Sequence, residues 1–169
     1  MLSSNQEFSG KLIRHQPVLL KGNGKIIVGE NVEIGVVSSA CFHNSYGYIE
    51  ARKTNSKIVF GDNVKINNNV LVVADQSEII IEENVIIGIN CQIFNSDFHN
   101  LHPSQRNSIN FKSEAIRIHK NVFLGNNVII LKAVTIGENS IIGAGSVVAT
   151  SIPANVVAAG NPAKVLKVL

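Results

Sequence analysis

The sequence predicts an all-β solenoid, in which a chain of 169 residues coils around one aliphatic core. Three observations predict it: an apolar residue recurs at every sixth position, Ile and Val together supply 43 residues, and 21 Asn and 13 Gly supply turns. β-branched residues favour strands, and Asn and Gly tolerate the left-handed backbone conformation that sharp turns need. The length fits one domain, so we expect residues 1–169 to form a single unit.

The six-residue period predicts the strands in order along the chain. Its apolar slots are Val28 and Ile34, then Phe60, Ile66 and Val72, then Ile81, Ile87 and Ile93, and finally Ile118, Leu124, Ile130, Ile136, Ile142 and Val148. A second inward residue, small or β-branched, stands two positions before most slots: Val32, Val64, Val70, Val85, Cys91, Val122, Val128, Val134, Ser140 and Ser146. Alternation of this kind is typical of short strands with one buried face.

The turns between these strands are also periodic. Gly often follows the apolar slot directly, and Asn stands three positions after it, at Asn31, Asn63, Asn69, Asn84, Asn90, Asn121, Asn127 and Asn139. Asn accepts the left-handed conformation better than other residues with a side chain, so we expect one corner of the chain at each.

Units of six residues cannot bury a core alone, but stacked units can, each contributing to an aliphatic column. The alternative is a sandwich of ordinary amphipathic strands, whose spacing would be irregular at about 8–12 residues. The six-residue period, without a miss from Ile118 to Val148, favours the solenoid. The period alone leaves the number of strands per coil and the hand of the coil open.

Three interruptions of the period are the candidate functional segments, because regular coils are structural and excursions carry sites. The frame is lost between Ile34 and Phe60, across residues 41–48. The spacing from Val72 to Ile81 is three residues longer than one repeat, and the extra residues lie around 74–77. The segment from Ile93 to Ile118 is a long polar loop containing two His, one Asp and one Pro.

Charge and targeting signals exclude several classes. Lys plus Arg total 15 against 12 Asp plus Glu, and the basic residues are scattered, so a nucleic-acid surface is not indicated. Cys41 and Cys91 form no CxxC motif, which suits a reducing compartment. The first 17 residues lack an apolar run, so we expect no signal peptide and a cytoplasmic location. The uncharged stretch 139–163 contains Pro and Gly, and we interpret it as solenoid rather than a membrane span.

Several motifs resemble the hexapeptide-repeat acyltransferases: GENV, GDNV, GNNVIILKAVTIGENSIIGAGSVV and the ending IPANVVAAGNPAKVLK. The resemblance covers the chain from about residue 20 onward. It implies a left-handed parallel β-helix with three hexapeptides per coil, an inserted catalytic loop at 94–115 and a short C-terminal extension. It also implies a homotrimer that binds acetyl-CoA in grooves between subunits.

The long loop resembles the catalytic loop of sugar O-acetyltransferases of the maltose, galactoside and nodulation-factor type. In those enzymes a His-Pro-Leu-Asp-Pro-like run begins with the catalytic histidine, and His99 stands at that place here, with Asn100 and His102 differing from the run. An imidazole is neutral near pH 7 and can accept a proton from an alcohol that attacks a thioester. Its second nitrogen needs an acceptor, either Asp97 or a backbone carbonyl.

The resemblance also implies the remaining site residues. Acetyl-CoA would lie near Asn126 and Ala144, with its phosphates neutralised by Lys164 and Lys167. The acceptor would contact Asn69, Asp75 and His102, and we expect it to be a sugar or polysaccharide precursor.

Three other functions remain open at this point. An antibiotic or other small-molecule acetyltransferase would use the same fold. A γ-carbonic-anhydrase-like enzyme would need three His on zinc, and the spacing of the five His does not match that pattern, so we expect no metal. A non-catalytic solenoid would have no reason to carry the histidine loop.

Overall fold

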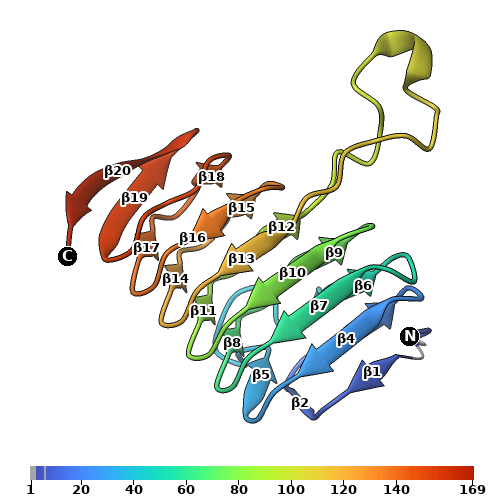
Figure 1. Cartoon of the computed structure of the whole chain (residues 1–169). Coiled ribbons are helices and arrows are strands. Elements are labelled where there is room, and N and C mark those ends of the chain that lie inside the picture. Colours follow the sequence, from blue (N-terminus) through green and yellow to red (C-terminus); the bar gives the residue numbers. More distant parts are fainter. Residues whose placement is uncertain (1–2, 6) are drawn as a thin grey trace.

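A computed structural model describes residues 3–5 and 7–169 and shows a parallel β-helix with three sheets (Figure 1). Met1, Leu2 and Gln6, part of the segment expected to lack a signal peptide, lie outside the described residues. The three-sided coil is the left-handed β-helix that the motifs implied. No helix in the described part of the chain is long and apolar enough to cross a membrane.

Successive strands pass from the first sheet to the second to the third, so each sheet takes every third strand. The first sheet contains β1 (Phe8–Ser9), β4 (Lys25–Val28), β7 (Lys57–Phe60), β10 (Glu78–Ile81), β13 (Ile116–Ile118) and β16 (Thr135–Ile136). The second contains β2 (Leu12–Arg14), β5 (Val32–Ile34), β8 (Lys65–Ile66), β11 (Ile86–Ile87), β14 (Phe123–Leu124), β17 (Ile141–Ile142), β19 (Val156–Gly160) and β20 (Ala163–Val168). The third contains β3 (Val18–Lys21), β6 (Gly47–Ala51), β9 (Leu71–Ala74), β12 (Gln92–Phe94), β15 (Ile129–Ile130) and β18 (Val147–Val148).

The core consists of the predicted apolar slots. All fourteen are at most 5% exposed, and the ten residues two positions before them are at most 1% exposed. Ile118 pairs in register with Ile136, eighteen residues later, so one coil holds three hexapeptides. Each slot therefore stacks on the equivalent slot of the next coil, and the aliphatic column predicted from the sequence is confirmed.

The asparagine corners are confirmed as well. All eight predicted Asn residues have φ between 55° and 62°, and Asn155 adds a ninth at 60°. Their side chains form ladders from coil to coil: the Asn69 amide donates to Asn90 (2.9 Å), and the Asn90 amide donates to Asn127 (3.1 Å). The residue that permits the sharp turn thus also joins neighbouring coils by hydrogen bonds.

The interruptions lie at two corners of the coil. The first leaves the solenoid after Gly35, but the chain rejoins it at Gly47 as β6, so the last residues of the predicted excursion are strand. The second lengthens the corner after β9 by Asp75, Gln76 and Ser77. The third joins β12 to β13 and carries the 3₁₀ helix η1 (Pro103–Gln105), which the sequence pattern did not predict.

The C-terminal end of the solenoid departs from the parallel pattern. Strand β19 pairs with β17 in parallel, and β20 then folds back antiparallel on β19 to form a hairpin at the edge of the second sheet (Figure 1). This hairpin is the short extension expected from the sequence, and it carries Lys164 and Lys167.

An ion-pair network at the corner after β10 makes stability depend on pH. Burial alone would raise the pKa of Glu82, but hydrogen bonds from His119 Nδ1 (3.0 Å), Arg117 (3.2 Å) and the Lys120 backbone N–H (3.1 Å) hold that pKa below its usual value. A carboxylate with a lowered folded pKa stabilises the fold above its unfolded pKa and loses that contribution as pH falls through the folded pKa.

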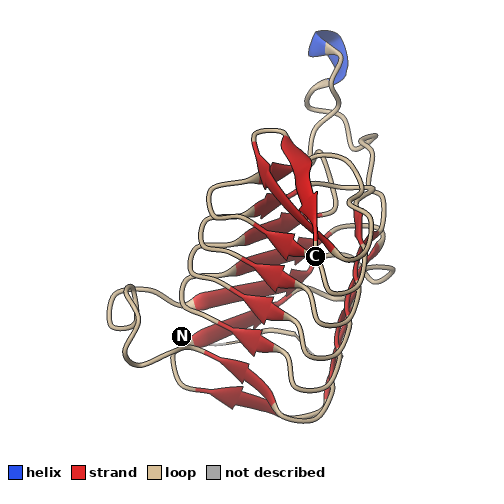
Figure 2. Ribbon diagram, turned by 90° about the vertical axis from the view of Figure 1, so that its left-hand side faces the viewer, coloured by secondary structure: helices blue, strands red, loops and turns tan. Residues whose placement is uncertain are grey.

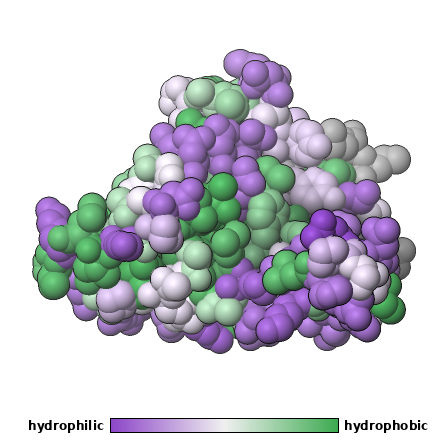
Figure 3. All heavy atoms as spheres, turned by 90° about the horizontal axis from the view of Figure 1, so that it is seen from above, coloured by the Kyte–Doolittle hydropathy of each residue, from purple (hydrophilic) through white to green (hydrophobic). Residues whose placement is uncertain are grey.

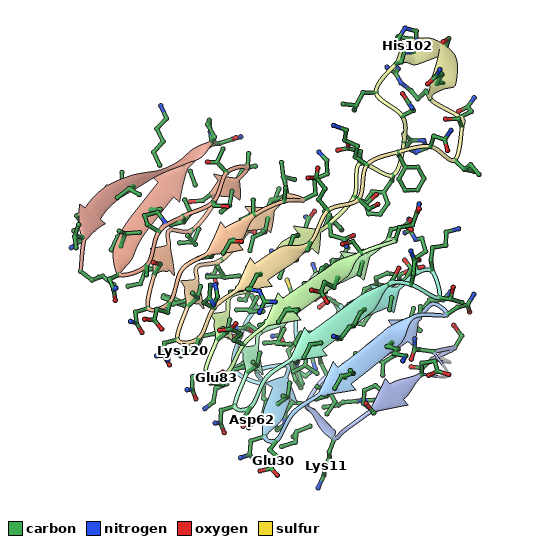
Figure 4. All side chains as sticks on the ribbon, in the orientation of Figure 1. Lys11, Glu30, Asp62, Glu83, His102 and Lys120 are labelled. Carbon is green, nitrogen blue, oxygen red and sulfur yellow. The ribbon has the colours of Figure 1, made fainter. Side chains whose placement is uncertain are left out.

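We therefore expect Glu82→Gln to lower the free energy of unfolding by about 1 kcal/mol at pH 7, measured by urea denaturation. The deficit should close as pH falls below the ordinary pKa of glutamate. Glu83→Gln is the matched control, because Glu83 is the exposed neighbour and points outward at the same corner (Figure 4). A deficit that persists unchanged at low pH would contradict the role of the carboxylate charge.

Candidate active site

The loop between β12 and β13 stands clear of the solenoid, with η1 at its far end (Figure 2). Its two ends run antiparallel as a stalk. Asp97 N–H donates to the Lys112 carbonyl (3.0 Å), Glu114 N–H donates to the Asn95 carbonyl (2.9 Å), and the Ser113 hydroxyl donates to Ser96 Oγ (2.9 Å). These bonds tie the base of the loop together while the tip is exposed.

A cleft of about 400 Å³ opens at this loop. Polar and apolar side chains share its walls, which suits a ligand with both hydroxyl groups and apolar surface. The lining residues are Gln76, Asp97, His99, Asn100, Leu101, Ile109, Asn110, Phe111 and Lys112. Asp97 and His99, the two predicted catalytic residues, therefore lie on one cleft.

His99 is exposed, and its ring is held by a backbone carbonyl. Nδ1–H donates to the carbonyl of Arg106 (3.1 Å) across the loop. This bond selects the tautomer in which Nε2 carries no proton, because a carbonyl can only accept. Nε2 is thus the nitrogen that can accept a proton from a bound hydroxyl. Of the two partners considered for Nδ1, the structure supplies the carbonyl.

Asp97 has a different partner. Its Oδ1 lies 3.0 Å from Lys132 Nζ, and both side chains are partly exposed, at 21% and 25%. Lys132 follows β15 in the next coil, on the same corner as the loop base. The carboxylate therefore anchors the loop to the adjacent coil. Lys132 was not among the predicted site residues, although the coil period alone places it at this corner.

The three predicted acceptor residues are not gathered in one place. His102 lies at the tip of the loop (Figure 4), with Nδ1 2.8 Å from Ser104 Oγ. Asn69 lies at the corner between the second and third sheets, where it lines another cleft with Tyr46, Tyr48 and Leu71. Asp75 is 1% exposed and its Oδ2 lies 3.5 Å from the Arg52 guanidinium. The geometry of Asp75 supports a role through Arg52 rather than contact with an acceptor.

The residues expected at acetyl-CoA occupy a different corner. Asn126 and Ala144 are exposed on successive coils where the second sheet turns into the third. Asn126 Oδ1 accepts from the Ile89 N–H (3.1 Å), and a Cβ on Gly88 would lie 2.6 Å from that oxygen. Glycine at this position therefore lets the corners of neighbouring coils stack closely. The exposed edge of these stacked corners, which carries Asn126 and Ala144, is a place at which an extended ligand could lie.

Lys164 and Lys167 are exposed on β20, where they pair with Ala159 and Val157 of β19. Two ammonium groups on the β19–β20 hairpin, near Ala144, suit the phosphates of a nucleotide. The ammonium groups of Lys164 and Lys167 thus fit the phosphates at the nucleotide end of acetyl-CoA.

The histidines outside the loop have structural partners. His15 lies 3.1 Å from Glu33, His119 binds Glu82, and His43 packs edge to face on Phe42. Among residues 3–5 and 7–169, no group of three or more His, Cys, Asp or Glu side chains is placed to hold a metal ion. The three-histidine arrangement that a zinc enzyme of this fold would need is not assembled within one described chain.

Comparisons with known proteins agree with the geometry. Residues 115–150 match the family model described as bacterial transferase hexapeptide (six repeats). Galactoside O-acetyltransferase of Escherichia coli K12 is 39% identical over 113 residues, which cover 64% of this chain and 55% of that protein. This chain spans about half the length of several other curated relatives as well.

Two further matches cover a larger share of the matched protein. WbbJ of Escherichia coli K12, named as a lipopolysaccharide biosynthesis O-acetyl transferase, is 32% identical over 164 residues, covering 89% of this chain and 76% of that protein. A hexapeptide-repeat acetyltransferase of Vibrio cholerae, crystallised with acetyl coenzyme A, superposes with a TM-score of 0.62 at 34% identity, covering 68% of this chain and 61% of that one. With its coil, its histidine loop and these matches, the chain belongs to the hexapeptide-repeat acetyltransferase family.

Proposed function

We propose that this protein is an acetyl-CoA-dependent O-acetyltransferase that acts on a hydroxyl of a sugar, in the modification of a surface polysaccharide or oligosaccharide. The observation that carries the proposal is His99: it stands in the one long polar loop of the described solenoid, it lines a cleft, and its Nδ1 is held so that Nε2 is free to act as a base. The names of the galactoside and lipopolysaccharide relatives support a sugar acceptor.

The reaction follows from these groups. His99 Nε2 takes the proton of the acceptor hydroxyl while the oxygen attacks the thioester carbonyl, and a backbone N–H near the corner receives the developing oxyanion. When the tetrahedral intermediate collapses, the carbon–sulfur bond breaks and the imidazolium returns the proton to the leaving thiolate. The products are an acetyl ester and free CoA, and no acyl-enzyme forms.

Lys164 and Lys167 bind the CoA phosphates in this proposal. Changing both to Ala should raise KM for acetyl-CoA about tenfold, the effect of losing about 1.4 kcal/mol of binding, and leave kcat nearly unchanged. Initial rates across acetyl-CoA concentrations measure this. Lys120→Ala is the control, since Lys120 pairs with Glu138 (3.4 Å) at a different corner (Figure 4). An unaltered KM in the double variant would refute the assignment.

The two halves of the proposed site lie on different corners of one chain. His99 extends from the corner between the third and first sheets, whereas Asn126 and Ala144 lie between the second and third sheets. A neighbouring subunit can bring one corner against the other. Apolar side chains also face outward near the acetyl-CoA corner: Phe123 is 43% exposed, and Ile129, Ile141 and Val147 are partly exposed.

We therefore expect a homotrimer in solution. Hydrophobic side chains gather in the middle of one face, among hydrophilic ones, and again at the end that carries the C-terminal hairpin (Figure 3). Exposed apolar patches of this kind favour association. Sedimentation equilibrium at micromolar concentration should give the mass of three chains, and Phe123→Glu should shift it toward the monomer. A monomer for the unmodified protein would overturn the expectation.

A screen of acceptors tests the proposed substrate class. Sugars, oligosaccharides and nucleotide sugars are incubated with acetyl-CoA, and the released thiol is measured against a matched set of hydroxyl-bearing antibiotics. Thiol release that requires a sugar supports the proposal. Release only with the antibiotics would assign the protein to small-molecule acetylation on the same fold.

A further inference from the structure

Arg52 lies beneath the histidine loop although it comes from a coil two turns earlier. It directly follows β6, at the corner between the third and first sheets. Its NH2 donates to Glu50 Oε2 (3.0 Å), and its NH1 lies 3.5 Å from Oδ2 of the buried Asp75. The two terminal nitrogens of the Arg52 guanidinium thus pair with two different carboxylates. Because the guanidinium is planar, these two contacts fix its orientation.

The opposite contact of this guanidinium is aromatic. The Phe98 ring covers it, with 4.7 Å from Arg52 Cζ to the ring centroid, and Phe94 packs edge to face on Phe98 at 6.0 Å. Arginine is attracted to the face of such a ring within about 6 Å. This contact packs the loop residue Phe98 against the solenoid.

The backbone at Phe98 is strained. Its φ is +58°, a conformation that is a genuine outlier for a bulky side chain. Such strain persists where surrounding contacts over-determine the conformation, and it is concentrated at functional sites. Here the chain bends at Phe98, between Asp97 and His99, and both of these residues line the same cleft.

A second connection joins the same three coils. Asn95, fully buried at the base of the loop, accepts from the Asp75 N–H through Oδ1 (2.7 Å). Asp75 in turn faces Arg52. Arg52, Asp75, Asn95 and Phe98 therefore form one contiguous set running from the second coil to the loop, and His99 is the next residue after that set.

We propose that Arg52 is a positioning residue for His99: the guanidinium, fixed by Glu50 and Asp75, seats the Phe98 ring and so aims the adjacent His99 at the cleft. This inference rests on the proposed function and adds to it a group that does not line the cleft. A general base displaced by about 1 Å loses on the order of 10²-fold in rate, so an effect on kcat follows from the geometry.

Arg52→Lys removes the planar guanidinium that contacts the Phe98 ring, and it keeps the positive charge beside the buried Asp75. We expect kcat to fall at least about tenfold with KM for acetyl-CoA within about twofold, since only orientation changes. Phe98→Leu leaves both carboxylate contacts of Arg52 intact and should give the same fall in kcat. Phe98→Tyr keeps an aromatic ring over Arg52 and should keep kcat close to that of the unmodified protein. Arg117→Lys is the matched control, because Arg117 has similar exposure and pairs with Glu82 away from the loop.

A second readout reports the loop directly. The chain contains no Trp, so Asn107→Trp places a single tryptophan on the exposed loop, whose emission is followed. Its anisotropy should fall when Arg52→Lys is added and remain unchanged when Arg117→Lys is added. If either kcat or the anisotropy is unchanged in Arg52→Lys, the inference is overturned. If the unmodified protein transfers no acetyl group, the proposed function fails, and the anisotropy still decides whether Arg52 orders the loop.

Discussion

Replacing His99 with alanine is expected to lower kcat by about 10²–10⁴, the contribution of a positioned general base. The fold should be unaffected, because His99 is exposed on a loop outside the aliphatic column and its one hydrogen bond joins two residues of that loop. Initial rates with a verified sugar acceptor measure the first effect. Thermal unfolding of the same preparations measures the second, and Tm should be nearly unchanged.

The neighbouring loop residues are the controls for this result. His102→Ala should retain most of the turnover, because His102 lies at the loop tip and does not line the cleft. Asp97→Asn should give an intermediate rate, because it weakens the pair with Lys132 that anchors the loop. If His102→Ala abolishes turnover while His99→Ala retains it, His102 is the base. If neither matters, the acetyl-transfer mechanism is wrong.

Replacing Ile81 with alanine is expected to destabilise the protein by about 2–5 kcal/mol, the cost of a large-to-small change in a packed core. Ile81 is fully buried in the first sheet, where it pairs in register with Phe60 on one side and Ile118 on the other. A cavity there removes contacts from three successive coils. Urea unfolding at fixed protein concentration measures the loss, since any association of subunits makes stability depend on concentration.

Ile80 provides the matched control for this core prediction. It is the preceding residue of β10, it is also isoleucine, and it faces outward. Ile80→Ala should cost about 1 kcal/mol or less, the range of exposed strand positions. Equal losses at both positions would show that the alternation of inward and outward residues does not govern stability.

The solenoid could be predicted from the sequence because its physics is local and repeated. One aliphatic side chain per hexapeptide must be buried, and at most corners one residue takes a positive φ, so both features are visible at a fixed period. Ala133 shows the limit of this reasoning: it takes φ of 63° at a corner without being Asn or Gly. There the period still marks the corner, three residues after Ile130, but the residue type carries no signal.

The candidate site could be predicted only in part. The interruption of the period located the loop, and resemblance singled out His99. The partners of these residues come from other coils: Arg52 lies far earlier in the chain than Phe98, and Lys132 lies after the loop returns. Such contacts depend on the path of an irregular loop, which no periodic signal describes. For the same reason the burial of Asp75 could not be predicted, since it arises where a lengthened corner meets the next coil.

The central claim is direct transfer of an acetyl group from acetyl-CoA to a sugar hydroxyl by the loop histidine. Mass spectrometry of both the acceptor and the protein, after incubation with acetyl-CoA, tests it most directly. We predict one acetyl ester on the sugar for each thiol released, no acetylated protein, and loss of the ester with His99→Ala. Thiol release without an acetylated sugar, or an acetyl group trapped on the protein, would contradict the claim.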